Sequence, residues 1–127
     1  MSKILVTGGC GFIGSNLVDL LVADNEVYVV DNLDTGKKEN CNPNAKYIFE
    51  DIRDVFSGEV PEYLEGVEVV FHLAALARIQ PSFNRPAKTI DVNARGTSLV
   101  CEFARNVGAK VVYAGSSSFY AGVYLNP

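Results

Sequence analysis

Short runs of β-branched and aromatic residues recur along the chain, and each run stops at a polar or small residue. Runs of this length and composition predict β-strands. We therefore expect five strands, at Lys3–Thr7, Glu26–Asp31, Lys46–Glu50, Glu68–His72 and Lys110–Ala114.

Apolar residues with a helical period lie between some of these runs. After the first run, a stripe of four such residues predicts a helix packed on the sheet. Its members are Ile13, Leu17, Leu20 and Leu21. Before the fifth run, a longer stripe predicts a second helix from about Thr89 to Gly108, a residue that commonly ends helices. Its members are Gly96, Leu99, Val100, Phe103, Ala104 and Val107.

The alternation of strand and helix signals predicts a parallel sheet joined by right-handed crossovers. We expect the strand order 3-2-1-4-5, with a ligand crevice at the carboxyl edge between strands one and four. The middle of the chain is less regular. Residues 32–45 are polar and rich in turn-forming residues, and residues 61–66 allow at most a short helix.

Composition limits the possible function classes. With 127 residues, of which 48% are hydrophobic, the chain can bury one core of ordinary domain size. The formal net charge of −4 and the scattered basic residues do not make the basic stripe that nucleic acids require. No apolar run approaches the roughly 18 residues of a membrane span, and the first residues do not form a secretory signal. We expect neither a nucleic-acid partner nor a membrane partner.

The three cysteines, Cys10, Cys41 and Cys101, are widely spaced and form no C-x-x-C pair. This pattern predicts neither a disulfide framework nor a zinc site, so we expect no bound metal. A reducing, cytoplasmic setting fits this cysteine usage best.

A glycine-rich loop follows the first predicted strand and opens the first predicted helix, from Thr7 to Gly14. The free N–H groups and the positive dipole end of such a helix attract a pyrophosphate. A side chain at Gly8 or Gly11 would obstruct the turn or the approach of phosphate, and one at Gly14 would push the helix off the sheet. Gly9 also fits the G-x-G-x-x-G pattern, so the register of the first glycine stays open. The alternative is a turn that only connects the two elements.

The second predicted strand ends at Asp31. A carboxylate there can accept hydrogen bonds from both adenosine ribose hydroxyls and repels a 2′-phosphate, so the sequence favours NAD over NADP. Lys37 and Lys38 lie nearby in the sequence and leave NADP open. The alternative for Asp31 is an acidic residue at an exposed strand end.

Six motifs occur in order along the chain: TGGCGFIGSNLV at Thr7–Val18, DNLDTGKKEN at Asp31–Asn40, EDIRD at Glu50–Asp54, FHLAA at Phe71–Ala75, VNARGT at Val92–Thr97 and YAGSSSFYAG at Tyr113–Gly122. With this order and spacing the chain resembles the NAD-dependent sugar epimerase/dehydratase family, the extended branch of the short-chain dehydrogenase/reductases. UDP-glucose 4-epimerases are the members it resembles most.

The resemblance implies an α/β fold, a Rossmann-type parallel sheet with helices on both faces. It implies that residues 1–127 are an NAD-binding domain, the N-terminal part of a larger enzyme whose substrate-binding part is absent. It further implies an isomerase of nucleotide-sugar metabolism, with a UDP-hexose as substrate and a homodimer as the whole enzyme.

The resemblance also assigns cofactor-binding residues. The diphosphate is assigned to Gly8, Gly11, Phe12, Ile13 and Gly14. The adenosine ribose is assigned to Asp31 and Asn32, and the adenine edge and face to Asp51 and Ile52. The turn beneath the cofactor's ribose is assigned to Leu73, Ala74 and Ala75, and Asn93 is also counted among the cofactor-binding residues.

Two polar residues near that turn have competing interpretations. Asn93 matches a helix asparagine that supports the active site through backbone contacts in the family, and a mid-helix asparagine is otherwise mildly unfavourable. Its alternative is an incidental polar residue. His72, the chain's one histidine, ends an apolar strand and is interpreted as a satisfied structural residue rather than a general base.

Three serines stand beyond the fifth predicted strand, at the edge where ligands bind. Their hydroxyls can bind a substrate hydroxyl or stabilise an alkoxide, and the alternative is a serine-rich turn. The resemblance places the catalytic hydroxyl at Ser116 and substrate contacts at Ser117 and Ser118. Sugar dehydratases carry Asp-Glu at these last two positions, so their absence favours epimerase-like oxidation and re-reduction at C4.

The family's catalytic base is a tyrosine in Y-x-x-x-K, and no tyrosine of this chain has a lysine four residues later. Asn126-Pro127 is similar to the pair that precedes that tyrosine. We therefore expect an N-terminal fragment that is inactive alone. Three functions stay open: the cofactor part of a nucleotide-sugar epimerase, another nucleotide-sugar oxidoreductase such as a reductase or decarboxylase, and a non-catalytic NAD-binding module.

Overall fold

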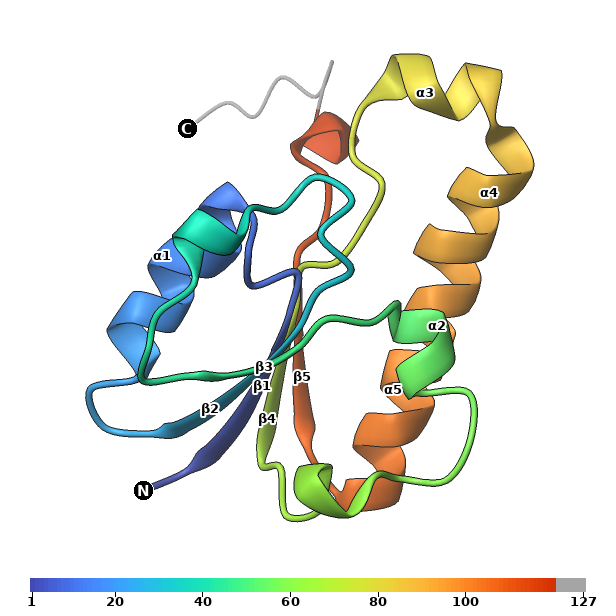
Figure 1. Cartoon of the computed structure of the whole chain (residues 1–127). Helices are drawn as coiled ribbons and strands as arrows, with labels where there is room; N and C mark the ends of the chain where they lie inside the picture. The colour runs from blue at the N-terminus through green and yellow to red at the C-terminus, as the bar shows by residue number, and fades with distance from the viewer. Residues whose placement is uncertain (121–127) are drawn as a thin grey trace, which may run out of the picture.

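A five-stranded parallel sheet forms the centre of the molecule in the computed structural model, which describes residues 1–120 (Figure 1). The strands are β1 (Lys3–Thr7), β2 (Glu26–Val30), β3 (Lys46–Ile48), β4 (Val69–His72) and β5 (Lys110–Tyr113). Their order is β3-β2-β1-β4-β5, and every adjacent pair is parallel. The predicted strand order and α/β class are confirmed.

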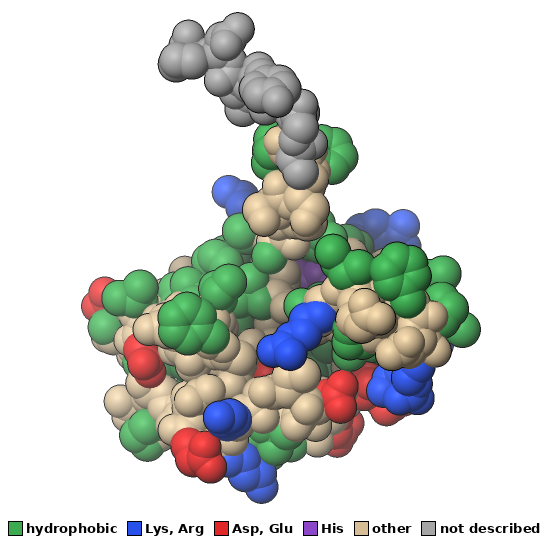
Figure 2. Space-filling model, turned by 90° about the horizontal axis from the view of Figure 1, so that it is seen from above, with side chains coloured by type: hydrophobic (Ala, Val, Ile, Leu, Met, Phe, Trp, Pro, Cys, Tyr) green, Lys and Arg blue, Asp and Glu red, His purple; other side chains and the backbone are tan. Residues whose placement is uncertain are grey.

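The strand register brings the ends of the three central strands to one edge. Thr7, the last residue of β1, is opposite Val30 of β2 and His72 of β4. The glycine-rich loop, Asp31 and Leu73 therefore leave the sheet side by side at its carboxyl edge. Figure 2 looks down on the end of the molecule that contains this edge, and hydrophobic side chains gather around it.

Helices cover both faces of the sheet, as Figure 1 shows. Helix α1 (Phe12–Leu21) lies on one face, and α2 (Ile52–Val55) and α5 (Gly96–Val107) lie on the other. Helices α3 (Ile79–Asn84) and α4 (Pro86–Ile90) stand beyond the carboxyl edge, and the π-helical turn η3 (Asp91–Arg95) joins α4 to α5. Short 3-10 turns are η1 (Lys38–Asn40), η2 (Glu62–Leu64) and η4 (Ser117–Tyr120). The sequence predicted neither α3 nor the π-helical turn.

Alternating residues of the central strands divide the apolar interior into two cores. The core under α1 contains Ile4, Val6, Cys10, Val18, Val27 and Val29. The core under α2 and α5 contains Leu5, Tyr28, Val30, Ile52, Val55, Phe56, Leu64, Val67, Val70, Val100, Phe103 and Ala104. Because both faces of β1 and β2 are buried, their sequences are almost continuously apolar.

The predicted buried stripe of α1 is wrong at two of its four positions. Ile13 is 67% exposed and Leu20 is 78% exposed. The face toward the sheet is instead Gly14, Leu17, Val18 and Leu21, with Gly14 and Val18 fully covered. These positions follow i, i+3, i+4 and i+7, and the helix can approach closely because the first of them has no side chain. The stripe of α5 packs on the sheet as predicted.

A chain of hydrogen bonds joins Thr7, His72 and Thr97 beneath the carboxyl edge. The Thr7 hydroxyl lies 2.7 Å from His72 Nδ1, and His72 Nε2 lies 2.8 Å from the Thr97 hydroxyl. The Thr7 oxygen also accepts the N–H groups of Leu73 and Ala74, so its own proton points to Nδ1. His72 is therefore neutral, with its proton on Nε2, and it is a satisfied structural residue as the sequence suggested.

Within residues 1–120, no helix is long and apolar enough to cross a membrane. In the same residues, no group of three or more side chains is arranged to hold a metal ion.

His72 gives the fold a pH dependence. Burial lowers the pKa of His72 below the ordinary value of 6.5. The unfolded chain therefore takes up this proton first, and the free energy of unfolding falls as the pH drops below about 6.5. The loss stops once the folded state is protonated too. We expect His72→Gln, which keeps one acceptor and one donor, to remove this part of the slope in urea unfolding between pH 7.5 and 5.

Comparison of the two proteins isolates His72, because their carboxyl groups titrate alike. Since the chain has one histidine, NMR titration of its ring signals also reads that pKa directly. Equal slopes in both proteins, or a ring that titrates at 6.5 or above, would contradict the neutral, buried assignment.

Candidate functional site

A groove of about 370 Å³ opens at the carboxyl edge of the sheet, between the glycine-rich loop and the turn after β4. Four segments line it. The first contains Gly8 and Gly11–Gly14, the second Val30–Asn32 and Asp34–Gly36, the third Glu50–Ile52 and the fourth Leu73–Ala77. Val92 and Ala114 also line the groove. This is the crevice between β1 and β4 that the predicted strand order requires.

The glycine-rich loop packs backbone against backbone. Gly8 has a left-handed backbone with φ 74°, and a Cβ there would lie 2.8 Å from the Ala74 nitrogen. A Cβ on Gly14 would collide with the Gly8 carbonyl oxygen, and one on Gly9 would collide with Val29. Gly8 is therefore the glycine of the tight turn, while Gly9 serves the packing of the loop on β2. This geometry favours Gly8 as the first glycine of the pattern.

Gly11 differs from its neighbours. It has an extended backbone with φ −77° and ψ 179°, and a Cβ there would meet only the Gly8 carbonyl oxygen, at an ordinary 3.5 Å. Gly11 lines the groove, and no hydrogen bond within residues 1–120 uses the backbone N–H of Phe12 or Ile13. The fold itself leaves room for a side chain at Gly11, and that space borders free N–H donors at the positive end of α1.

The Asp31 carboxylate connects the glycine-rich loop with the segment that follows β2. One oxygen accepts the Cys10 N–H at 2.9 Å, and the other accepts the Leu33 N–H at 2.8 Å. The residue is 8% exposed and lines the groove. Asp31 therefore shapes the glycine-rich loop and the following segment, a role that its position at a strand end did not reveal.

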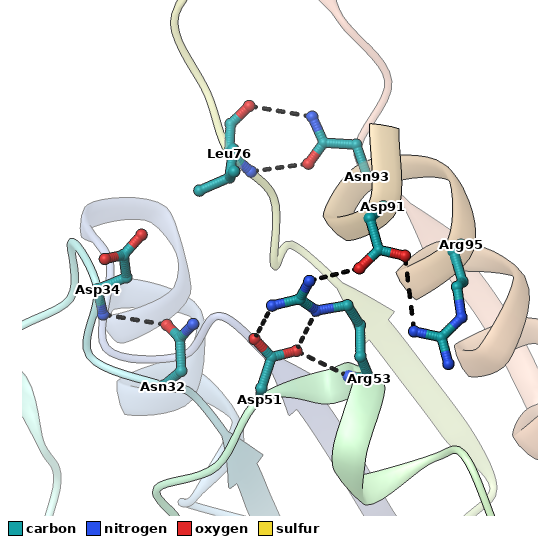
Figure 3. Close-up of polar contacts among 8 residues, drawn as sticks. All are labelled: Asn32, Asp34, Asp51, Arg53, Leu76, Asp91, Asn93 and Arg95. Carbon is teal, nitrogen blue, oxygen red and sulfur yellow. Dashed lines mark hydrogen bonds and ion pairs between the residues drawn. The ribbon is translucent and has the colours of Figure 1, made fainter. Parts of the chain in front are cut away.

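Asn32 and Asp34 lie beside Asp31 in the same wall. The Asn32 side-chain oxygen accepts the Asp34 N–H at 3.0 Å, which closes a local turn (Figure 3). Both residues line the groove. This turn places two polar residues of the β2–η1 segment in the groove wall.

Asp51 begins helix α2 and pairs with Arg53. It accepts the Arg53 backbone N–H at 2.8 Å and binds the guanidinium at 2.9 and 2.8 Å (Figure 3). The hydrogen bonds from the Arg53 side chain hold the pKa of Asp51 at about 2. Arg53 also bonds Asp91 of the π-helical turn. The groove wall at Asp51 is thereby joined to the π-helical turn that carries Asn93.

Ile52 has a second contact besides the groove. It is 5% exposed and belongs to the core under α5, where a Cβ on Gly96 would lie 2.7 Å from its Cδ1. The glycine in α5 thus makes room for Ile52 and lets α2 approach α5.

The turn after β4 is held from two sides. The Thr7 hydroxyl accepts the N–H groups of Leu73 and Ala74, both at 3.2 Å. Asn93 accepts the Leu76 N–H at 2.8 Å and donates to the Leu76 carbonyl at 3.0 Å (Figure 3). Asn93 itself does not line the groove, whereas Leu73 through Ala77 do. In the structure, Asn93 fixes the backbone of a groove-wall segment at Leu76.

The three serines lie apart from this wall. Ser116, Ser117 and Ser118 are exposed, and none of them lines the groove. The Ser116 hydroxyl accepts the Ser118 N–H at 3.2 Å, so it closes the turn η4. Ala114, two residues earlier, does line the groove. Asn126-Pro127, the pair that was likened to the one before the family's tyrosine, lies outside the described residues.

The structure adds residues to which the sequence had assigned no role. Thr35 and Gly36 line the groove, and their motif was visible as DNLDTG. Leu76 and Ala77 extend the small-residue turn. For Thr7 and Arg53 the sequence offered no sign of their long-range contacts.

The family model described as "NAD dependent epimerase/dehydratase family" matches residues 4–124. UDP-glucuronic acid decarboxylase 4 of Arabidopsis thaliana is 39% identical over 132 residues, which cover 98% of this chain and 28% of that protein. Among solved structures, UDP-glucose 4-epimerase of Thermotoga maritima with UDP-glucose superposes with a TM-score of 0.85 at 40% identity. That match covers 91% of this chain and 38% of the other.

A second structure is the Thermus thermophilus UDP-glucose 4-epimerase in complex with NAD. It superposes with a TM-score of 0.78 at 36% identity and covers 90% of this chain and 37% of that one. The chain thus spans well under half the length of these relatives. The glycine-rich loop, the parallel sheet and the family match over nearly all residues agree, and the chain belongs to the NAD-dependent epimerase/dehydratase family.

Proposed function

We propose that the chain is the cofactor-binding part of an NAD-dependent nucleotide-sugar epimerase, with NAD in the groove at the carboxyl edge. The observation that carries this proposal is the unused space at Gly11 beside the free N–H groups of Phe12 and Ile13. A diphosphate needs this combination of close backbone approach and N–H donors.

The remaining groove residues fit the other parts of the cofactor. Asp31 and Asn32 offer side-chain oxygens for ribose hydroxyls, and Asp51 with Ile52 offers a polar edge and an apolar face for adenine. Ala74 and Ala75 bring backbone and small side chains along the opposite wall. Titrating the protein with NAD by calorimetry tests the proposal, and the absence of binding would overturn it.

A bound nicotinamide cofactor supplies the hydride acceptor and donor for oxidation and re-reduction at C4 of the sugar. The protein residues orient it: Asn93 fixes the backbone at Leu76, and Thr7 fixes the turn at Leu73 and Ala74. We assign Ser116 a hydrogen bond to the reacting sugar hydroxyl, and Ser117 and Ser118 contacts to the substrate. Ser116 lacks a neighbouring base in residues 1–120, so we expect no turnover without a further proton acceptor.

We propose a UDP-hexose as the substrate, because the Thermotoga structure that this chain resembles contains UDP-glucose. The similarity to a UDP-glucuronic acid decarboxylase favours a second candidate, oxidative decarboxylation of a UDP-uronic acid. Incubating the full-length protein with UDP-glucose and with UDP-glucuronate separates them. Formation of a C4 epimer supports the first, and release of CO2 supports the second.

Gly11→Ala tests the diphosphate site apart from the fold. The structure has room for the methyl group, so we expect the free energy of unfolding to change by less than about 1 kcal/mol. The same methyl group would hold the diphosphate away from the N–H donors, and we expect NAD affinity to fall by about 1–3 kcal/mol. Chemical unfolding and calorimetry measure the two effects.

Gly14→Ala is the matched control, because its methyl group collides with the backbone of Gly8 and Gly9. We expect it to destabilise the fold by about 1–3 kcal/mol or more. If Gly11→Ala binds NAD as the parent does, the diphosphate does not lie at this loop.

Asp31→Asn tests the choice between cofactors. Removing the charge should narrow the preference for NAD over NADP by about 1–3 kcal/mol, because repulsion of the 2′-phosphate is lost. The substitution also disturbs the bonds to Cys10 and Leu33, which weakens both cofactors alike. The ratio of the two affinities is therefore the readout. Equal affinities of the unsubstituted protein for NAD and NADP would defeat the argument.

A further inference from the structure

Two cysteine side chains meet behind the glycine-rich loop. Cys10 belongs to that loop and is fully buried, and Cys41 directly follows η1 and is partly buried. Their sulfur atoms lie 3.7 Å apart. The third cysteine, Cys101, is exposed on α5.

The backbone around these thiols holds them in contact. The Cys10 carbonyl accepts the Lys37 N–H at 3.1 Å and the Asn40 side-chain amide at 2.9 Å. A Cβ on Gly36 would lie 2.8 Å from the Cys10 Cβ, so this segment passes directly over Cys10. The backbone of the β2–η1 segment is therefore held against Cys10, and Cys41 follows directly after it.

A disulfide bond is about 2.05 Å long, so the two sulfurs need to approach by roughly 1.6 Å. Side-chain rotation with a small shift of the segment can supply such a movement. The hydrogen bonds of Lys37 and Asn40 keep the backbones together while it occurs.

We propose that Cys10 and Cys41 form a dithiol site that a peroxide oxidises to an intramolecular disulfide. The more accessible Cys41 sulfur attacks a peroxide oxygen, the O–O bond breaks, and Cys41 becomes a sulfenic acid. The Cys10 sulfur then attacks the Cys41 sulfur, and the hydroxyl group leaves as water with the proton of the Cys10 thiol. In total the two thiols lose two protons and two electrons. Hydrogen peroxide is thereby reduced to two water molecules, and an organic peroxide to one alcohol and one water.

The environment supports this order of events. Burial, with the Asp31 carboxylate nearby, raises the pKa of Cys10 to about 12. Cys10 therefore stays protonated and shielded, and Cys41 meets the oxidant first. The contact between the two sulfurs compensates for the small thiolate fraction of Cys10 in the second step.

The disulfide would act on the groove, a consequence that rests on the proposed function. Cys10 lies directly before Gly11, and its N–H holds the Asp31 carboxylate. Drawing the Cys10 sulfur toward Cys41 shifts both groups, because Cys10 is fully buried and close-packed neighbours transmit such a movement. We expect the oxidised protein to bind NAD about tenfold more weakly.

The modification is tested by treating the protein with hydrogen peroxide and mapping disulfide-linked peptides by mass spectrometry. We expect a Cys10–Cys41 link in the unsubstituted protein and in Cys101→Ser, its matched control, and none in Cys41→Ser. Loss of two hydrogen atoms per molecule and loss of two titratable thiols should accompany it. If Cys10 and Cys41 both stay reduced while Cys101 is oxidised, the proposal is overturned.

The effect on the groove is tested by NAD titration before oxidation, after oxidation and after reduction with a dithiol. We expect weaker binding only in the oxidised state, with recovery on reduction and no change in peroxide-treated Cys41→Ser. A disulfide that leaves NAD affinity unchanged would refute the link to the groove. If the reduced protein binds no NAD, the proposed function fails, while the peptide map still decides the dithiol site.

Discussion

The close contact of backbone with backbone at the glycine-rich loop is the constraint on which the rest of the structure depends. The carbonyl of Gly8 occupies the place where a side chain of Gly14 would lie, and the backbone of Ala74 occupies the place of a side chain at Gly8. Strand β1, helix α1 and the turn after β4 therefore meet without side chains between them. The Thr7 hydroxyl completes this junction, because it bonds two N–H groups of that turn.

The sequence predicted the sheet almost completely and the helices less well. Strands buried on both faces have a local composition that identifies them, and the loop at Gly8–Gly14 fixed where the first helix begins. The inward face of α1 was mistaken because Gly14 carries no hydrophobic signal, although its spacing with Val18 makes it the centre of that face. Helix α3 was missed because it is only six residues long, contains Pro81 and has just two large hydrophobic residues, Ile79 and Phe83.

The candidate site also contains residues that the sequence identified and residues that only the structure reveals. Residues within a motif were found from local signals: Asp31 because it ends a predicted strand, and Asp51 because the EDIRD motif resembles the family's. Contacts between segments distant in sequence left no local pattern: Thr7 reaches Ala74 across 67 positions, and Arg53 reaches Asp91 across 38. The serines after β5 illustrate the opposite case, since their position at the correct edge did not place them in the groove wall.

The π-helical turn between α4 and α5 determines how the protein responds to the loss of one residue. Such a turn closes its hydrogen bonds over one residue more than an α-helical turn. Deleting one residue between Asp91 and Arg95 would restore a regular α-helix. It would also remove the bulge on which Asn93 lies and so disturb the two hydrogen bonds between Asn93 and the Leu76 backbone. The wide turn thus presents Asn93 to a groove segment 17 positions earlier, so the extra residue serves a contact outside the helix.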